Sequence, residues 1–261
     1  MVYERELAFA HDIAREAGAI MKKYYRIDQK VTIKTDNTPV TIADTEINEL
    51  LIKKVQGHFP EYGVIGEEAN WMPERTKLWV CDPIDGTVAF MIHVPTSMFS
   101  LAFVDDGRPV VGVAYNPWTD ELYHAAIGKG AFCNGQPITV SRRKWGKEDI
   151  RIGSSSSRLR DVFNNVELVR KLAEKRVFVN SSPGLVHAGC TLAEGVIEGR
   201  IFPHHTVHDV AALKVIIEEA GGKVTDLDGN EQRYDRPVNG AIMSNGLIHE
   251  ELIKVYADSR N

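Results

Sequence analysis

The sequence has few cysteines, no long apolar run and no excess of positive charge, and each shortage excludes a class of protein. Three cysteines occur among 261 residues, and no Cys-x-x-Cys pair is present. An odd number of widely spaced cysteines, here Cys81, Cys133 and Cys190, predicts neither a disulfide framework nor a zinc site. We therefore expect a reduced protein of the cytoplasm.

Long apolar segments are also missing. No stretch approaches the roughly 20 consecutive apolar residues that are needed to cross a bilayer. The first residues, Met1–Glu6, contain neither a basic segment nor an apolar core of the kind found in secretion signals. We expect a chain that is neither exported nor attached to a membrane.

Basic residues do not outnumber acidic ones. The 31 Lys and Arg residues are set against 36 Asp and Glu residues, which gives a net charge of −5 with histidine neutral. Mild acidity disfavours a broad basic face for nucleic acid, so we expect no nucleic-acid partner. A content of 43% hydrophobic and 26% charged residues is that of a globular protein and argues against a disordered or fibrous chain. A chain of this length buries enough surface to fold without a structural metal.

Hydrophobic periodicity predicts alternating helices and strands. Spacings of three and four predict helices, and β-rich runs on either side of Asp105-Asp-Gly-Arg-Pro109 predict a hairpin with a tight turn. No internal repeat or long linker is visible, so we predict one unit of layered helices and sheets over residues 1–261. The expected helices lie at 7–24, 41–55, 166–174, 184–194 and 209–221, and the expected strands at 99–104, 110–115, 122–126, 151–153 and 177–180.

The densest polar segment follows a short apolar run. Leu78–Cys81 predicts a buried strand that ends at Asp82, because the proline that follows cannot continue a central ladder. Asp85 lies three residues further on, and two such carboxylates repel each other unless a positive charge lies between them. With Glu67 and the carbonyl of Ile84 they offer only oxygen ligands, which suit a hard cation such as Mg²⁺ better than zinc.

Gly86 and Thr87 come directly after these acids. A Gly-Thr pair that opens a helix presents backbone N–H groups and a hydroxyl to an anion. A cation site beside a helix start indicates a phosphate site. An acidic segment beside Gly and Thr is also typical of a solvated turn, so the residues by themselves leave both interpretations open.

Asp82-Pro-Ile-Asp-Gly-Thr87 resembles the signature of the inositol monophosphatase family of metal-dependent, lithium-sensitive phosphatases. Relatives in that group act on fructose bisphosphate, histidinol phosphate and 3′-phosphoadenosine nucleotides. Val40-Thr-Ile-Ala-Asp44 resembles the family's first acidic segment, Ile65-Gly-Glu-Glu68 its metal-binding segment, and His208-Asp-Val-Ala-Ala212 its second signature. The resemblance covers nearly the whole chain and implies an α/β (α+β) fold, a layered α-β-α-β-α sandwich like that of inositol monophosphatase and fructose-1,6-bisphosphatase.

The resemblance implies a role for each matching position. The implied metal ligands are Glu67, Asp82, Asp85, Asp209 and the carbonyl of Ile84. They would hold two or three Mg²⁺ ions, with Mn²⁺ as a substitute and Li⁺ or Ca²⁺ as inhibitors.

The implied catalytic residues are Glu67, Thr87 and Asp44, with Thr87 paired to Asp44 so that the attacking water is oriented and polarised. The implied substrate-binding residues are Asp85, Gly86, Thr87 and Asp209. Together they describe a homodimeric, Mg²⁺-dependent phosphomonoesterase that hydrolyses a small soluble phosphate ester by means of a metal-activated water.

Two departures from the family pattern concern the substrate. His208 stands where the second signature usually begins with Trp, and Phe202 stands where inositol-specific members carry Glu. A phenyl ring cannot accept a hydrogen bond from a sugar hydroxyl, so we do not expect myo-inositol monophosphate to be preferred. The alternative activities are those of a histidinol-phosphatase, a 3′-phosphoadenosine-type nucleotidase and a fructose-1,6-bisphosphatase. A regulatory binding protein with incidental catalysis is the alternative from another class.

Overall fold

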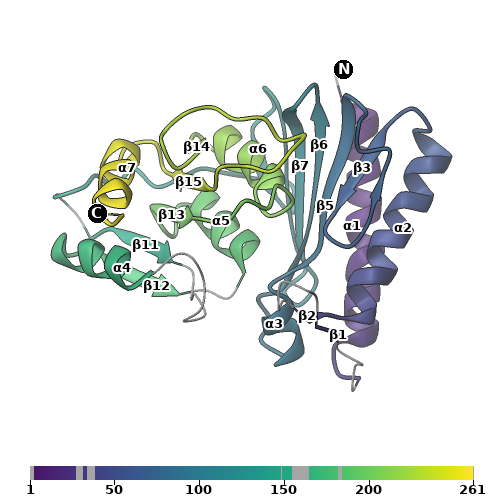
Figure 1. Ribbon diagram of the computed structural model, residues 1–261, viewed down its shortest axis with the longest axis horizontal. Helices are drawn as coiled ribbons and strands as arrows, with labels where there is room; N and C mark the ends of the chain where they lie inside the picture. Colours follow the sequence, from purple (N-terminus) through teal and green to yellow (C-terminus); the bar gives the residue numbers. More distant parts are fainter. Residues whose placement is uncertain are drawn as a thin grey trace.

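A computed structural model describes residues 3–27, 32–33, 39–147, 149–154, 165–181 and 184–260. Helices and sheets alternate along the longest axis of the molecule (Figure 1). The helices are α1 (Glu4–Tyr24), α2 (Ile42–His58), α3 (Thr87–Met91), α4 (Asn165–Glu174), α5 (Leu185–Ala193), α6 (Ala211–Glu219) and α7 (His249–Asp258). In the described part of the chain, no helix has the length and apolar character that crossing a membrane requires.

The larger sheet contains the predicted hairpin. Asp106 and Gly107 both have positive φ at the turn between β6 and β7, as a tight hairpin turn requires. All neighbouring strands in this sheet are antiparallel except β3 and β5. The strands in order across it are β10 (Gln136–Ile138), β9 (Ala131–Cys133), β8 (Glu121–Ala126), β7 (Arg108–Asn116), β6 (Met98–Asp105), β5 (Lys77–Asp85), β3 (Gly63–Gly66) and β4 (Asn70–Trp71).

The smaller sheet mixes parallel and antiparallel pairs. The first three strands across it are parallel to one another, and the last three pair antiparallel. Their order is β12 (Phe178–Ser181), β11 (Arg151–Ser154), β13 (Gly199–Phe202), β15 (Ala241–Ser244) and β14 (Lys223–Thr225). A separate pair, β1 (Thr32–Ile33) and β2 (Pro39–Val40), lies before α2.

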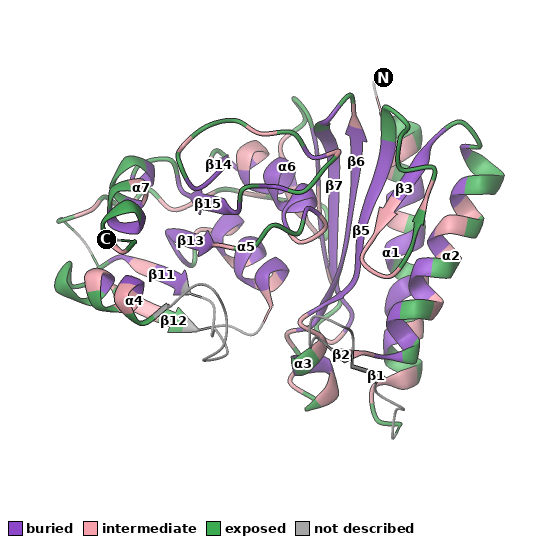
Figure 2. Ribbon diagram, in the orientation of Figure 1, coloured by how far each residue is buried: buried purple, intermediate pink, exposed green. Residues whose placement is uncertain are grey.

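Three apolar clusters join the layers and confirm the expected α-β-α-β-α sandwich. Helices α1 and α2 pack on the outer face of the larger sheet, where Ile13, Leu51 and Trp79 belong to one apolar cluster. Helices α5 and α6 lie between the two sheets, and α4 and α7 cover the far face of the smaller sheet. The central strands β5, β6 and β7 are buried along most of their length (Figure 2), because helices cover both faces of the sheet.

The expected helices and strands are present, but the prediction that the strand over 78–81 ends at Asp82 is wrong. Strand β5 continues through Pro83 to Asp85, and its pairing with β6 becomes irregular between Asp82 and Asp85. Proline is tolerated because the ladder is already interrupted there. The N–H of Ile84 donates to Oδ1 of Asp82, 3.0 Å away, which satisfies it outside the ladder. Helix α7 and strands β1–β4 and β13–β15 were not predicted.

Candidate active site

Three buried or half-buried aspartates meet at the end of β5. Oxygens of Asp82, Asp85 and Asp209 lie within 4.8 Å of one another. The first two belong to β5, and the irregular pairing at Pro83 brings both carboxylates to the same side. Asp209 precedes α6 by two residues, and the hydroxyl of Thr206 donates to its Oδ2. Residues more than a hundred positions apart in the sequence thus form one acidic cluster.

A second acidic cluster lies next to the first. Oxygens of Asp44, Glu67 and Glu68 also lie within 4.8 Å of one another. Asp44 is in the first turn of α2, where its Oδ2 accepts hydrogen bonds from the backbone N–H and the hydroxyl of Thr41 at 2.8 and 2.6 Å. Its Oδ1 is buried and has no hydrogen-bond partner among the residues that the structure describes. The N–H of Glu67 donates to the carbonyl of Cys81 at 3.1 Å and continues the parallel pairing of β3 with β5, which places Glu67 beside the end of β5.

The two clusters interact electrostatically. Burial raises the pKa of Asp82 well above its usual range, and the charges of Glu67, Asp209, Asp85 and Asp44 raise it further. Burial also raises the pKa of Asp44 to about 7, although the hydrogen bonds from Thr41 oppose the shift. Carboxylates this close are stable only with protons or a cation among them.

The remaining acids of the first cluster show the same effect. Burial and the charge of Asp209 raise the pKa of Asp85 to about 7, while backbone hydrogen bonds from Leu185 and Val186 lower it. Burial raises the pKa of Asp209 as well, with the hydrogen bond from Thr206 acting in the opposite direction. The donors are all oxygens, so the set suits a hard divalent cation of the Mg²⁺ type.

Gly86 and Thr87 lie where the sequence predicts, at the start of a helix. Gly86 is the N-cap of α3 with φ 79°, and α3 itself has only five residues. The expected hydrogen bond between Thr87 and Asp44 is absent. The Thr87 hydroxyl donates instead to the carbonyl of Ile84 at 3.2 Å, while Thr41 occupies the second oxygen of Asp44. The reason is local: a hydroxyl at the first helical position reaches a carbonyl three residues earlier without moving the chain.

The two residues that depart from the family pattern are Phe202, at the end of β13, and His208, next to Asp209. Phe202 is buried, with 7% of its surface exposed, and belongs to the apolar cluster between the sheets. Its ring centroid is 5.1 Å from that of His204, which is exposed. Nε2 of His208 lies 3.7 Å from Oδ2 of Asp209. This side of the site therefore presents imidazole groups, and position 202 offers no carboxylate.

Sequence reasoning missed several residues of the site. Glu68 follows Glu67 in the sequence, but no function was predicted for it. The N–H groups of Leu185 and Val186, which bind Asp85, left no signal, because any residue except proline supplies a backbone N–H. Arg200, buried on β13 with its charge acting on Asp85, also gave no periodic signal.

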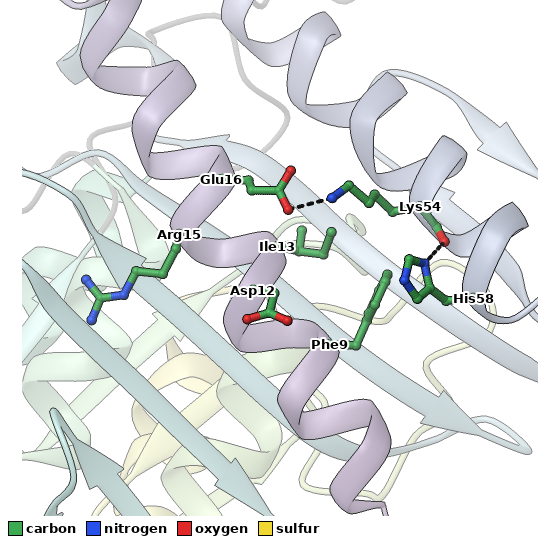
Figure 3. Close-up of a pocket in the computed structure, with 7 residues that line it drawn as sticks. All are labelled: Phe9, Asp12, Ile13, Arg15, Glu16, Lys54 and His58. Atoms are coloured by element: carbon green, nitrogen blue, oxygen red, sulfur yellow. Dashed lines mark hydrogen bonds and ion pairs between the residues drawn. The ribbon is translucent and has the colours of Figure 1, made fainter.

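A surface pocket of about 300 Å³ lies elsewhere, between α1 and α2 (Figure 3). Nζ of Lys54 is 2.6 Å from Oε1 of Glu16 at its rim. Lys54 lies ten residues after Asp44 on α2, about 15 Å along the helix axis, so the pocket is not part of the acidic site. Its lining residues are Phe9, Asp12, Ile13, Arg15, Glu16, Lys54 and His58.

Comparison with known proteins agrees with this geometry. The sequence profile of the inositol monophosphatase family matches residues 3–260. The chain is 31% identical over 251 residues to a fructose-1,6-bisphosphatase/inositol-1-monophosphatase of Thermotoga maritima, covering 95% of this chain and 94% of that one. It is 32% identical over 250 residues to a histidinol-phosphatase of Chlorobaculum parvum, covering 95% of both. A solved structure of a Thermotoga maritima IMPase superposes with a TM-score of 0.87 at 29% identity, covering 98% of both chains.

The layered fold and the acidic site at the end of β5 define a phosphatase, a hydrolase of phosphoric monoesters. The chain belongs to the inositol monophosphatase family.

Proposed function

We propose that this protein is a Mg²⁺-dependent phosphomonoesterase that hydrolyses a small soluble phosphate ester. The observation that carries the proposal is the approach of Asp82, Asp85 and Asp209 to within 4.8 Å in a largely buried site. Burying like charges together is costly, and a divalent cation among the three carboxylates offsets that cost.

The proposed metal ligands are the carboxylates of Glu67, Asp82, Asp85 and Asp209 and the carbonyl of Ile84. A bound divalent cation supplies positive charge for the phosphoryl oxygens and lowers the pKa of a coordinated water. The protein's own contribution is to hold these oxygens in place before the substrate arrives.

The other proposed roles concern the water and the phosphate. The buried Oδ1 of Asp44 and the carboxylate of Glu67 accept hydrogen bonds from the attacking water and orient it. The hydroxyl of Thr87 and the backbone N–H groups of Gly86 and Thr87 donate to phosphate oxygens. Because α3 is short, these N–H groups act as individual donors, and a helix dipole adds little.

We propose a substrate other than myo-inositol monophosphate. The buried ring of Phe202 offers no acceptor for sugar hydroxyls, and the relatives of the chain include a histidinol-phosphatase and a fructose-1,6-bisphosphatase/inositol-1-monophosphatase. Histidinol phosphate, fructose 1,6-bisphosphate and adenosine 3′,5′-bisphosphate are therefore the first candidates.

Steady-state release of phosphate from these three esters and from myo-inositol 1-phosphate tests the proposal. We expect turnover that needs Mg²⁺, stops with EDTA and returns when the metal is restored. Turnover that continues without divalent metal contradicts the metal-dependent mechanism. A dominant activity toward inositol phosphate contradicts only the inference from Phe202.

Location and assembly are also part of the proposal. Cys81, Cys133 and Cys190 are all free thiols, which supports a reducing compartment such as the cytoplasm. A homodimer follows from the family resemblance, and light scattering at several protein concentrations measures it.

A further inference from the structure

Asp85 is held by an element from the other half of the molecule. Its Oδ1 accepts a hydrogen bond from the N–H of Leu185 and its Oδ2 one from the N–H of Val186, each at 2.9 Å. These are the first two N–H groups of α5, a nine-residue helix between the sheets. Because each oxygen has its own donor, both the position and the plane of the carboxylate are fixed.

Gly184 makes this approach possible. It precedes α5 with φ 108° and ψ 128°, a conformation that other residues adopt only with strain. A Cβ atom built on Gly184 would lie 2.7 Å from Oδ2 of Asp85 and 3.5 Å from the carbonyl oxygen of Thr96. The carboxylate cannot yield easily, because two hydrogen bonds hold it.

Arg200 adds a positive charge that acts on the same carboxylate. It lies on β13, is 2% exposed, and its positive charge acts on Asp85. Gly153 lies opposite Arg200 on the neighbouring strand β11, and a Cβ atom built on Gly153 would lie 2.8 Å from Cδ of Arg200. The absence of a side chain at Gly153 therefore leaves room for Arg200. The two hydrogen bonds from α5 and the charge of Arg200 on β13 therefore reach Asp85 from outside the larger sheet, to which Asp85 itself belongs.

We propose that Gly184 is a positioning residue for the metal site: its missing side chain lets the start of α5 hold Asp85 in the orientation in which it faces Asp82 and Asp209. The inference rests on the proposed function, because it assigns Asp85 to a divalent cation. Gly184 touches neither metal nor substrate in this role and acts only through Asp85.

The first test compares Gly184→Ala with Gly135→Ala. Gly135 also has positive φ, 77°, but no atom lies within 4 Å of a Cβ built on it. Both variants carry a backbone penalty for alanine at positive φ, which is larger at Gly184, and only Gly184→Ala places a Cβ atom against Asp85. Titration calorimetry with Mg²⁺ alone is expected to show an affinity reduced about tenfold or more for Gly184→Ala, the size seen when groups that orient a metal ligand are lost. Gly135→Ala keeps the wild-type affinity.

The second test removes a donor without changing Gly184. Leu185→Pro lacks the N–H that binds Oδ1, and proline is compatible with the first position of a helix. Leu185→Ala loses the same buried side chain but keeps the N–H. We expect Leu185→Pro to bind Mg²⁺ several-fold more weakly than Leu185→Ala. Both variants lose the same core packing, so that loss does not explain a difference between them.

The outcomes separate this inference from the proposed function. If the wild-type protein takes up no Mg²⁺, the proposed metal site is wrong. If the wild-type protein binds Mg²⁺ and Gly184→Ala and Leu185→Pro bind it as tightly as their controls, the metal site stands and the positioning role of Gly184 is overturned.

Discussion

The carboxylate of Asp82 is repelled by four other carboxylates of the site. It is buried, and burial and four neighbouring carboxylates all raise its pKa. A group whose pKa is raised on folding stabilises the fold at low pH, and that contribution is lost as the pH rises through the folded-state pKa. Without metal, the contribution of Asp82 to the stability of the fold therefore decreases as the pH rises above the ordinary range of an aspartate.

Asp82→Asn is expected to separate stability from activity. The amide is close in size, keeps an acceptor for the N–H of Ile84 and removes one repelling charge. Without metal at pH 7.5 the variant should melt a few degrees higher than wild type, and its phosphatase activity should fall about a thousandfold or more, since several kcal/mol of charge stabilisation at the transition state is lost. Asp258→Asn, at an exposed position in α7, is the control and should change neither quantity. A metal-free Asp82→Asn protein that melts lower than wild type contradicts the electrostatic account.

His249 is expected to make the stability of the fold depend on pH. Its Nε2 lies 2.9 Å from the hydroxyl of Thr225 and its Nδ1 lies 2.8 Å from that of Ser244, and burial lowers its pKa to about 4. The charges of Lys223 and Lys214 lower the pKa further, and those of Glu250 and Glu231 raise it. In the unfolded chain histidine titrates near 6.5, so the unfolded state binds more protons between about pH 6.5 and pH 4.

Stability should therefore fall as the pH drops from about 6.5 to about 4, with a contribution from His249 of at most about 3 kcal/mol. Urea unfolding of wild type and His249→Gln at pH 7.5, 6.0 and 4.5 measures it. The difference between the two proteins isolates His249 from the acidic clusters, whose raised pKa values act in the opposite direction. The prediction fails if that difference does not change with pH.

At the scale of elements, α6 links the site to the far end of the larger sheet. The helix begins just after Asp209, and its last residue, Glu219, accepts hydrogen bonds from the N–H groups of Gly128, Lys129 and Gly130 at 2.8, 3.1 and 2.8 Å. These residues form the turn between β8 and β9. One carboxylate thus anchors the end of α6 to three backbone donors.

Glu219→Ala is expected to cost about 1–3 kcal/mol, because charge-assisted hydrogen bonds to backbone N–H groups are lost together. Glu219→Gln, which keeps acceptor capacity without the charge, should cost about half as much. Glu250→Ala is the matched control: Glu250 is largely exposed, and its pair with Lys223 at 3.4 Å is worth little. Denaturant unfolding compares the three variants. Equal losses for Glu219→Ala and Glu250→Ala contradict the anchoring role.

At the scale of the whole molecule, the acids come from two different layers, the larger sheet and the central helical layer. Asp82 and Asp85 belong to β5 of the larger sheet, whereas Asp209 precedes α6 and the start of α5 binds Asp85. Figure 1 shows α5 and α6 beside that sheet. A cation bound by all three carboxylates joins the halves, and it binds the folded chain much better than the unfolded one. Binding that is specific to the folded state stabilises the fold by mass action.

Mg²⁺ at about a hundred times its dissociation constant should stabilise the protein by about 2.7 kcal/mol, a rise in melting temperature of roughly 5–10 °C. Thermal unfolding in MgCl₂ and in EDTA measures the rise. NaCl of equal ionic strength and the Asp209→Asn variant are the controls, and neither should show it. An equal rise in NaCl means that screening of the acids, and not a bound cation, stabilises the fold.

The sequence by itself determined most of the helices, the central strands and the chemistry of the site. Helical spacing over 7–24 and the Asp-Gly turn after Asp105 predict structure through contacts between near neighbours, which the residue order contains directly. Carboxylates beside Gly86-Thr87 indicate a hard cation and a phosphate, because side-chain chemistry does not depend on the fold. The segments that resemble the family add Glu67 and Asp209 to the predicted metal ligands.

Only the tertiary structure decided which groups meet. Asp82 and Asp85 meet Asp209, and the start of α5 binds Asp85, because the two sheets pack around α5 and α6. The same packing leaves the Thr87 hydroxyl bonded to the carbonyl of Ile84 and not to Asp44. Backbone N–H groups are the same at nearly every position, so no pattern of side chains marks the ones that a fold will aim at a carboxylate. Distances between segments a hundred residues apart are set by the packed core, and residue order alone does not contain them.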